Sequence, residues 1–361
     1  MRIGITFDLK SDIPLPAHLP DDYQEEFDSP ATVEAIASVL RGLGHEVAFL
    51  GNGRAMLERV LASPPDFVFN FAEGQGVGRS REARVPAVLE MLGIPYTGSD
   101  PLTLAATLDK DCAKRLLTGA KHFRTPYGVL IESDQGPLDA LGEGFPFPAI
   151  AKPAWEGSSK GIRGKCLVQC LDDLLPVVES LRQDHRQPVL LEEYIDGEEL
   201  TVGVVGNDPP QVVGVMRVVP LQPAAQFIYS LEVKRDWERR VRYECPARLP
   251  GYGDNAFVEK AALEAYRMLG CRDVARIDFR LSKRGLYFLE ANPLPGLNPD
   301  TGDLIIMARL SGWSYEHLIG GIFQAALDRQ AGALSPIVAC PPKGALHLQP
   351  GNLVGGPFNG Q

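Results

Sequence analysis

The sequence is poor in the residues that mark zinc-binding, disulfide-stabilised or nucleic-acid-binding proteins. Its six cysteines are scattered without a CxxC pair, and its six histidines are equally dispersed along 361 residues. This spacing argues against a zinc site and predicts reduced thiols, mostly in hydrophobic cores. Acidic residues outnumber basic ones, 46 to 36, and the net charge of −10 argues against a general nucleic-acid binder.

Long hydrophobic runs are missing as well. No apolar stretch is long enough to span a bilayer, and the N-terminus lacks the apolar core and cleavage site of a signal peptide. We therefore expect a cytoplasmic protein with neither a membrane nor a nucleic acid as partner. The hydrophobic content of 45% and the length of 361 residues predict a globular protein of two or three domains.

The first 105 residues alternate short apolar strands with helices that end at glycine. RIGITF, HEVAFL and PDFVFNF predict strands, and ATVEAIASVLRGLG and REARVPAVLEMLG predict helices. This alternation predicts a small parallel α/β domain. EGQGVG at 73–78 resembles a dinucleotide fingerprint, but its spacing is GxGxG. We interpret it as a loop at a strand end, with Glu73 lining a cleft.

The remainder of the chain mixes strands and helices without an internal repeat. LTLAATLDKDCAKRLLTGA predicts one amphipathic helix, and the polar stretch 222–242 predicts a lid. From residue 331 the chain is rich in proline and glycine, which predicts a loosely ordered tail. Further elements are predicted as helices at 172–183, 255–269 and 315–329, and as a strand at 212–219.

ARIDFRLSKRGLYFLEANP, residues 275–293, predicts a β-hairpin with two facing carboxylates. A three-residue loop, KRG, pairs Leu286 with Ser282 and places Glu290 opposite Asp278. Two carboxylates across a ladder repel each other unless a cation lies between them. Few, hard oxygen ligands predict Mg²⁺ completed by phosphate oxygens and water. The alternative is a solvated sheet face with alternating charges.

The alternation of side chains along these strands assigns their two faces. Arg276 and Asn292 lie on the carboxylate face, because strand side chains alternate. The opposite face is apolar and is expected to meet a core; it carries Ile277, Phe279, Tyr287 and Leu289.

Two more segments suit a nucleotide. AKPAWEGSSKGIRG, residues 151–164, follows a strand, so Lys152 supplies a charge at the strand end and the glycines and serines expose N–H groups to phosphate. In LLEEYIDGEEL, the backbone of residues 193–195 would meet adenine and Glu199 the ribose hydroxyls. The alternatives are a flexible connection and a charged, solvated turn.

In this order the segments resemble the ATP-grasp superfamily, and more closely D-alanine–D-alanine ligase and its relatives. The resemblance covers about residues 60–330 and rests on TLDKDCAKRLL, FPAIAKPAWEGSSKGI, LLEEYIDGEELTV, VKRDW…YECPA and ARIDFR…YFLEANPLPGL. It implies a protein of the α/β and α+β classes with the ATP-grasp fold. The implied parts are a small parallel α/β (pre-ATP-grasp) domain at 1–105, a central α+β subdomain at 106–192, a C-terminal α+β subdomain at 193–330 and a tail at 331–361.

The resemblance also implies cofactors and residue roles. ATP and Mg²⁺ would be used, a substrate carboxylate would become an acyl phosphate, and an amine would capture it. The implied metal ligands are Asp278, Glu290 and Asn292, and the implied catalytic residues are Arg276, Lys234, Ser158 and Gly296. The implied ATP-binding residues are Lys110, Lys152, Gly157, Ser158, Ser159, Gly161, Glu192, Glu193, Tyr194, Ile195, Glu199 and Lys234.

The departures from this family concern the substrates. RIGITFDLKSDIPLP lacks the family's glycine-rich loop with its serine and glutamate, NFAEGQG replaces a His-Gly stretch, and Lys234-Arg235 replaces Lys-Tyr. PGLNPDTGD replaces Pro-Gly-Met-Thr. We therefore predict an ATP-dependent carboxylate–amine ligase that joins amino acids or small peptides other than two D-alanines, and the resemblance implies a homodimer, as is frequent in the family. Its substrate residues would include Glu73, Arg235, Asn298 and Thr301. The alternatives are an authentic D-alanine–D-alanine ligase and a non-catalytic ATP-binding regulator or scaffold.

Overall fold

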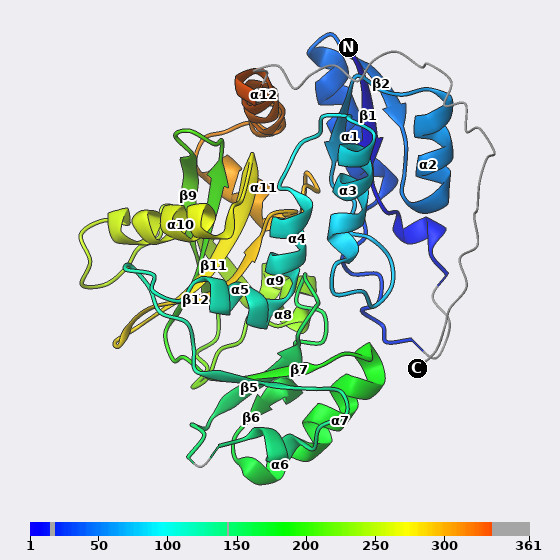
Figure 1. The fold of residues 1–361 in the computed structure, drawn as a ribbon. Coiled ribbons are helices and arrows are strands. Elements are labelled where there is room, and N and C mark those ends of the chain that lie inside the picture. Colours follow the sequence, from blue (N-terminus) through cyan, green and yellow to red (C-terminus); the bar gives the residue numbers. More distant parts are fainter. Residues whose placement is uncertain (15–18, 143, 334–361) are drawn as a thin grey trace, which may run out of the picture.

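The computed structural model describes residues 1–14, 19–142 and 144–333, and it contains three β-sheets flanked by helices (Figure 1). The predicted tail at 331–361 lies outside the described residues except for its first three, which continue the last helix. In the described part of the chain, no helix has the length and apolarity needed to cross a membrane. The division at residues 105, 192 and 330 stays a prediction.

The first sheet is parallel and has the order β2-β1-β3. As predicted, its strands alternate with helices that bury one face each, and Asn70 stands at the carboxyl end of β3. The elements are β1 (Arg2–Thr6), α1 (Pro30–Gly42), β2 (Glu46–Phe49), α2 (Gly53–Ala62), β3 (Phe67–Asn70) and α3 (Arg84–Met91), with short 3₁₀ turns at Lys10–Asp12 and Arg81–Ala83.

The second sheet is antiparallel, with the order β4-β7-β5-β6, and forms the separate lobe at the bottom of Figure 1. Its hydrophobic core consists only of residues between 131 and 191. The predicted helix at 172–183 lies two residues later. The elements are β4 (Gly128–Ile131), α6 (Pro137–Ala140), β5 (Ala149–Pro153), β6 (Leu167–Val168), α7 (Leu174–His185) and β7 (Val189–Glu193), with 3₁₀ turns at Gly164–Cys166 and Leu171–Asp173.

The third sheet is antiparallel, with the order β10-β9-β8-β11-β12. The predicted strand at 212–219 and helices at 255–269 and 315–329 are confirmed within a few residues. The elements are β8 (Glu198–Val205), β9 (Gln211–Pro220), α8 (Leu231–Arg235), α9 (Trp237–Arg240), β10 (Val241–Glu244), α10 (Ala256–Leu269), β11 (Val274–Ser282), β12 (Gly285–Asn292), α11 (Asp303–Leu310) and α12 (Tyr315–Ala333).

The predicted single helix after residue 101 is two helices, α4 (Pro101–Leu108) and α5 (Lys110–Leu116). Asp109 breaks it because its backbone is extended, and its carboxylate accepts a hydrogen bond from the N–H of Cys112 at the start of α5. Sequence periodicity runs through this break, since both helices bury apolar residues. The turn places Lys110 at the first position of α5, where it is buried.

The hairpin of β11 and β12 has the predicted carboxylate pair but not the predicted loop. Ser282 pairs with Gly285, not with Leu286, so the loop has two residues instead of three. A bulge between Asp278 and Phe279 shifts the register by one residue, and Asp278 again lies opposite Glu290.

This bulge also changes which residues of β12 meet the core. The core contains Ile277 and Phe279 as predicted, but they pack with Leu286 and Phe288. The prediction that Tyr287 and Leu289 belong to this core face is therefore wrong, because the shorter loop reverses the alternation of β12 before the bulge.

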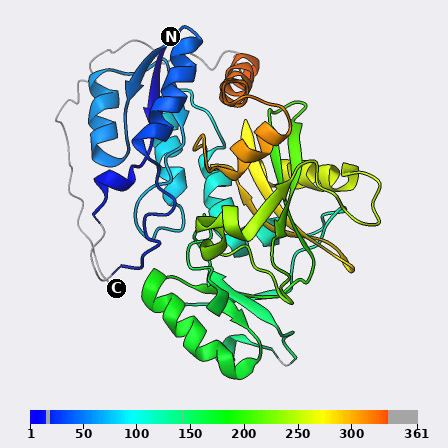
Figure 2. The same cartoon turned by 180° about the vertical axis from the view of Figure 1, so that it is seen from behind.

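One hydrophobic core joins the N-terminal sheet to the C-terminal helices. Ile3 of β1 and Ile36 of α1 belong to the same buried cluster as Leu304 of α11 and Phe323 of α12. The two views of the ribbon show α12 beside α1 although about 300 residues separate them in sequence (Figures 1 and 2). The N-terminal and C-terminal parts therefore pack as one body.

Candidate active site

Three adjoining cavities lie where the three sheets meet. The sheet cavity, of about 710 Å³, lies between the central and C-terminal sheets and is lined by Lys152, Glu192 to Ile195, Glu199, Lys234, Asp278 and Glu290, among others. The acidic cavity, of about 490 Å³, is lined by Glu73, Glu82, Lys110, Glu156 to Ser158, Arg276 and residues 290–296. The lid cavity, of about 1320 Å³, is lined by Asp28, Glu73, Lys234, Arg235, Arg276, Gly296, Asn298, Thr301 and Asp303, among others.

The sheet cavity has apolar walls with charged groups at one end. Ile150 of β5 and Leu289 of β12 contribute to opposite walls, and Ile195 lies in the connection between the two sheets. Leu289 lines this cavity because the shorter hairpin loop reverses the alternation of β12 and turns this side chain away from the core. An apolar slot that opens toward lysines suits a planar base followed by phosphates.

Lys152 and Lys114 share the buried carboxylate of Glu192. The Nζ of Lys152 lies 2.5 Å from Glu192, and Lys114 bonds the other oxygen. Burial alone would raise the pKa of Glu192, but the two lysines hold it below its ordinary value. Glu192 was expected to frame adenine; its carboxylate instead fixes two cations at the cavity wall.

A second ion pair fixes the side chain of Glu199, which was expected to bind the ribose hydroxyls. Glu199 of β8 forms an ion pair with Arg280 of β11. The guanidinium of Arg280 also donates to the carbonyl of Ile195 and lies over the ring of Tyr194, 5.3 Å from its centroid. Arg280 thereby ties together Tyr194, Ile195 and Glu199, the predicted adenine and ribose residues.

The oxygen atoms of the predicted metal ligands face cationic groups. Asp278 accepts hydrogen bonds from Arg276 at 3.1 and 2.9 Å, from Thr201 at 2.6 Å and from Asn292 at 3.3 Å. Glu290 lies 3.4 Å from the Nζ of Lys110. Burial opposes ionisation of Glu290, but Lys110 and other nearby cations hold its pKa well below the ordinary value.

This arrangement fits Mg²⁺. Two carboxylates and one amide, on neighbouring strands and all on one side of the hairpin, offer the hard oxygen ligands that the ion requires. In the structure, cationic side chains neutralise the negative charge that a metal ion would otherwise neutralise. Because the chain supplies only three ligands, phosphate oxygens and water would complete the coordination.

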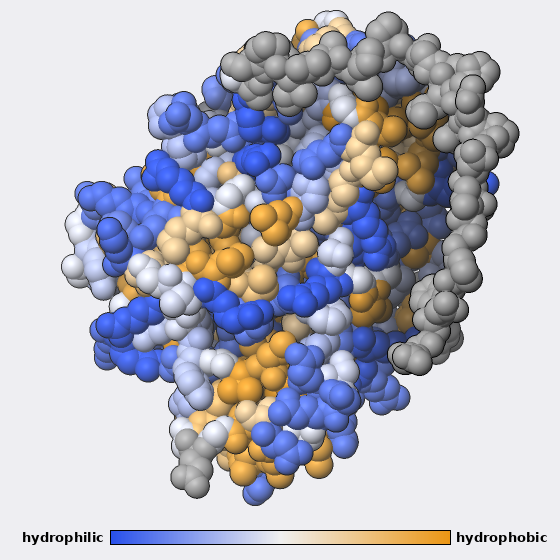
Figure 3. Space-filling model, in the orientation of Figure 1, coloured by the Kyte–Doolittle hydropathy of each residue, from blue (hydrophilic) through white to orange (hydrophobic). Residues whose placement is uncertain are grey.

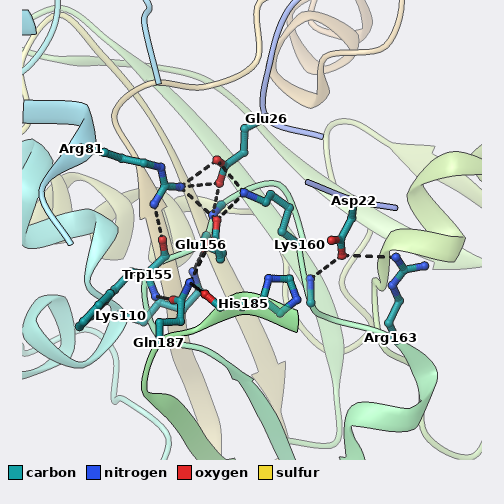
Figure 4. Close-up of polar contacts among 12 residues, drawn as sticks. Asp22, Glu26, Arg81, Lys110, Trp155, Glu156, Lys160, Arg163, His185 and Gln187 are labelled. Atoms are coloured by element: carbon teal, nitrogen blue, oxygen red, sulfur yellow. Dashed lines mark hydrogen bonds and ion pairs between the residues drawn. The ribbon is translucent and has the colours of Figure 1, made fainter. Parts of the chain in front are cut away.

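The glycine- and serine-rich loop after β5 is held by a buried cluster of charges (Figure 4). Glu26 pairs with Arg81 at 2.8 Å and with Lys160 at 3.2 Å, and Glu156 pairs with the same two cations at 3.2 and 2.6 Å. We call these four residues the Glu26 cluster. Burial would raise the pKa of Glu26, but Arg81, Lys160 and the N–H of Gly157 lower it to about 2.

Two N–H groups of this loop differ from the prediction. The N–H of Gly157 donates to Glu26 at 2.6 Å, and the N–H of Gly161 donates to Asp22 at 2.9 Å. Carboxylates therefore already satisfy the two donors that we expected to meet phosphate. Ser158 and Ser159, both with left-handed backbone, remain in the turn between them; Ser159 lines the sheet cavity and Ser158 the other two.

An acidic segment of the N-terminal region, residues 20–28, also contacts the lid; we call it the acidic strap. Arg235 of α8 pairs with Asp21 at 2.7 Å and Glu25 at 2.9 Å, and Arg163 of the loop pairs with Asp21 at 2.5 Å and with Asp22 at 3.3 Å. Arg235 lines the lid cavity, but its charge is directed to the strap.

The remaining predicted substrate residues surround the acidic and lid cavities. Thr301 is exposed at the lid cavity, and Asn298 orders its loop by accepting hydrogen bonds from the N–H groups of residues 300 and 301. Lys234 lines the sheet and lid cavities, 4.0 Å from Asp303. Arg276, Gly296, Ser158 and Glu73 line both the acidic and the lid cavities, so they mark the junction of the two.

Sequence reasoning missed Lys114, Arg280 and the Glu26 cluster. Lys114 follows Lys110 by four residues, so helical spacing could have placed both on one face. Arg280 follows Asp278 by two residues on the same strand face. Glu26 offered no local signal, because its partner Arg81 is 55 residues away in sequence.

Comparison with known proteins places the chain in a family. The family described as "D-ala D-ala ligase C-terminus" matches residues 128–324. An uncharacterized protein of Sinorhizobium fredii, y4sG, is 31% identical over 83% of this chain and 88% of its own length. The D-alanine–D-alanine ligase of Erythrobacter litoralis is 31% identical over 82% of this chain and 88% of its own.

A solved structure confirms the fold. The D-alanine–D-alanine ligase of Bacillus anthracis, complexed with ATP, superposes with a TM-score of 0.68 over 92% of this chain and 99% of its own, at 24% identity. The predicted α/β and α+β architecture of the ATP-grasp type is thus confirmed. The chain therefore belongs to the D-alanine–D-alanine ligase family, ATP-dependent ligases that form carbon–nitrogen bonds with ATP and Mg²⁺.

Proposed function

We propose that this protein is an ATP-dependent carboxylate–amine ligase that joins amino acids or small peptides other than two D-alanines. The carboxylate of one substrate attacks the γ-phosphorus of ATP, and ADP leaves. The amine of the second substrate attacks the resulting acyl phosphate, inorganic phosphate leaves, and the ammonium protons are released to solvent. One peptide-type bond forms for each ATP converted to ADP and phosphate.

The convergence of cations and carboxylates at the cavity junction carries this proposal. Lys152 and Lys234 line the sheet cavity, which would hold ATP with its phosphates toward Asp278. Arg276 lines the acidic and lid cavities, where the acyl group would form. Positioning and charge neutralisation supply most of the catalysis of phosphoryl transfer, and these side chains provide both.

Residues around Arg276 would complete the reaction site. The N–H of Gly296 and the guanidinium of Arg276 would stabilise the oxyanion of the tetrahedral intermediate. Lys110, 3.4 Å from Glu290, would place a charge between the metal ligands and the phosphates. The lid at 222–242, with α8 and α9, would exclude water that otherwise hydrolyses the acyl phosphate.

One observation supports substrates other than two D-alanines. It does not come from Arg235, because this side chain pairs with the acidic strap rather than facing the junction. Glu73 lines the junction, and in the described residues its carboxylate has no ion pair. The relatives named D-alanine–D-alanine ligase support the alternative, an authentic enzyme of that specificity.

The deciding experiment is ADP release by the purified protein with ATP and Mg²⁺, against D- and L-amino acids singly and in pairs, with products identified by mass. We expect an amide product from a pair other than two D-alanines. Efficient formation of D-alanyl-D-alanine, with no better pair, would establish the alternative.

A paired variant separates a ligase from a scaffold. Asp278→Asn with Glu290→Gln removes both ionised metal ligands, so we expect ADP release to fall by about a thousandfold or more. Glu46→Gln, exposed in β2 and outside the three cavities, is the control and should leave ADP release unchanged. Unchanged ADP release in the double variant would contradict the assigned metal site.

We also propose that the protein is cytoplasmic and forms a homodimer through its N-terminal region. Apolar side chains reach the surface on α2 and α3, including Leu61 and Met91, and Figure 3 shows apolar surface over α2. One chain has a mass of 39.3 kDa, and light scattering of the protein as it elutes from a size-exclusion column should give twice that mass. Leu61→Glu with Met91→Glu should give monomers; a wild-type monomer would refute the dimer.

A further inference from the structure

The acidic cavity contains two carboxylates, one buried and one half-buried, that have no ion pair in the described part of the chain. Glu82, in the turn before α3, is 7% exposed, and Glu73 follows the carboxyl end of β3. In the described part of the chain, neither side chain has a hydrogen bond or ion pair, although both line the cavity. Each other carboxylate of this cavity has a cation, since Glu156 meets Arg81 and Lys160, and Glu290 meets Lys110.

Such groups are costly in a folded protein. A buried carboxylate without a partner loses its hydration and gains nothing in return. Burial, together with neighbouring acids, accordingly raises the pKa of Glu73 well above its ordinary value and that of Glu82 to about 8. A cationic ligand would remove this penalty, and the cavity gives it access to both carboxylates.

The loop carrying Glu73 is fixed in place. Asp8 accepts hydrogen bonds from the N–H of Gly74 at 3.0 Å and from the side chain of Gln75 at 3.0 Å. A side chain at Gly74 would collide with the carbonyl of Arg81, so the loop packs directly against the turn that carries Glu82. The two carboxylates therefore belong to one rigid wall of the cavity.

The same cavity also offers the complementary chemistry. Arg276, which pairs with Asp278 and Asp303, and the N–H of Gly296 suit a carboxylate, whereas Glu73 and Glu82 suit cationic nitrogens. A ligand spanning the cavity would carry a carboxylate at one end and ammonium groups at the other. One α-ammonium would satisfy one carboxylate; Glu73, Glu82 and, farther into the lid cavity, Asp28 exceed that need.

We propose that Glu73 and Glu82 bind a second, cationic nitrogen, so that one substrate of this ligase is a diamino acid. This inference rests on the proposed function and names the class of one substrate. Neutral amino acids of the same length would leave at least one carboxylate buried without a partner, and they would bind more weakly for that reason.

The test compares charged and neutral side chains of equal length. ADP release with ATP and Mg²⁺ is measured with lysine against norleucine and with ornithine against norvaline, in both stereochemical forms and with a panel of second substrates. We expect a KM about 10- to 100-fold lower for the diamino acids, the range typical of a charge-assisted hydrogen bond. Equal KM values, or preference for the neutral partner, would overturn the inference.

Isosteric variants locate the effect. Glu73→Gln and Glu82→Gln should each remove most of the preference for lysine over norleucine, whereas Glu46→Gln, exposed in β2 and outside the three cavities, should keep it. Circular dichroism checks that the variants are folded. Variants that fold and retain the full preference would also overturn the inference.

A binding assay distinguishes this failure from failure of the proposed function. Thermal stabilisation by lysine and by norleucine is measured with a non-hydrolysable ATP analogue and Mg²⁺, so turnover is not needed. If the analogue binds but lysine has no advantage, the inference alone fails. If the analogue does not bind and no amino acid promotes ADP release, the proposed ligase itself is wrong.

Discussion

Two sets of buried carboxylates line one cleft, and they differ in what they face. On the loop and nucleotide side, Glu26, Glu192 and Glu290 each lie against a lysine or arginine. On the other side, neither Glu73 nor Glu82 has an ion pair in the described residues, although Arg81 acts on both carboxylates from beyond ion-pair distance. We infer that the paired carboxylates hold cations and loops in place, whereas the unpaired ones are able to bind a cationic ligand. The same chemical change should therefore have opposite effects on the two sides.

Glu26→Gln should have the largest effect on stability. It removes the charge shared by Arg81 and Lys160, leaving both cations with Glu156 alone. Breaking a buried pair costs about 3–5 kcal/mol of unfolding free energy. Urea denaturation followed by circular dichroism measures the loss. A cost below about 1 kcal/mol would mean that the Glu26 cluster does not hold the loop.

Glu82→Gln should raise the free energy of unfolding instead of lowering it, by an amount that depends on pH. The pKa of Glu82 is raised to about 8 from 4.5, because burial and the acids Glu26 and Glu156 outweigh Arg81 and Lys110. The folded state therefore binds a proton that the unfolded state releases, and wild-type stability from this group falls as pH rises from about 4.5 to 8.

Glutamine removes this pH dependence. We expect little difference between Glu82→Gln and the wild type near pH 5, and a gain for the variant of about 1–4 kcal/mol above pH 8. Urea denaturation at a series of pH values tests this expectation, with Glu46→Gln as the exposed control. A variant less stable than the wild type at pH 8 would show that Glu82 has a partner when folded.

Asp21→Asn should have the smallest effect. Asp21 pairs with Arg163 and Arg235, but its side chain is 66% exposed, so water already solvates the charges. Exposed pairs contribute about 0–1 kcal/mol. The contribution comes from a lowered pKa caused chiefly by Arg235, so it is present at neutral pH and lost in acid. A loss as large as that of Glu26→Gln would erase the distinction between buried and exposed pairs.

The sequence predicted those parts of the site whose residues are local or lie on one hairpin. The prediction that Asp278 lies opposite Glu290 is correct, although the predicted loop is wrong. The loop is one residue shorter than predicted, and a bulge shifts the register back by one residue. Alternation of side chains detects a strand, but a bulge depends on what packs against it. The shorter loop, in turn, reverses the alternation of β12, so Leu289, expected in the core, lines the sheet cavity instead.

Contacts between segments far apart in the chain could not be predicted from the sequence. Glu26 meets Gly157 across 131 residues, and Arg235 meets Asp21 across 214. No spacing rule relates an acidic segment near the N-terminus to a loop or a lid so far along the chain. The hairpin and two other segments predicted several of the nucleotide and metal residues, and the resemblance added others such as Lys110 and Lys234, but neither predicts their charge partners.

The hydrophobic core shared by α1 and α12 joins the N-terminal and C-terminal sheets into one body. The N-terminal sheet and the C-terminal sheet share buried residues, whereas the central sheet has a core of its own. A rotation of residues 128–193 against the rest of the molecule would open the cleft without disturbing either core. Glu26 lies on one side of that boundary, and Gly157 and Lys160 lie on the other. Such an opening would separate the buried charges of the Glu26 cluster, and its free-energy cost would therefore favour the closed cleft.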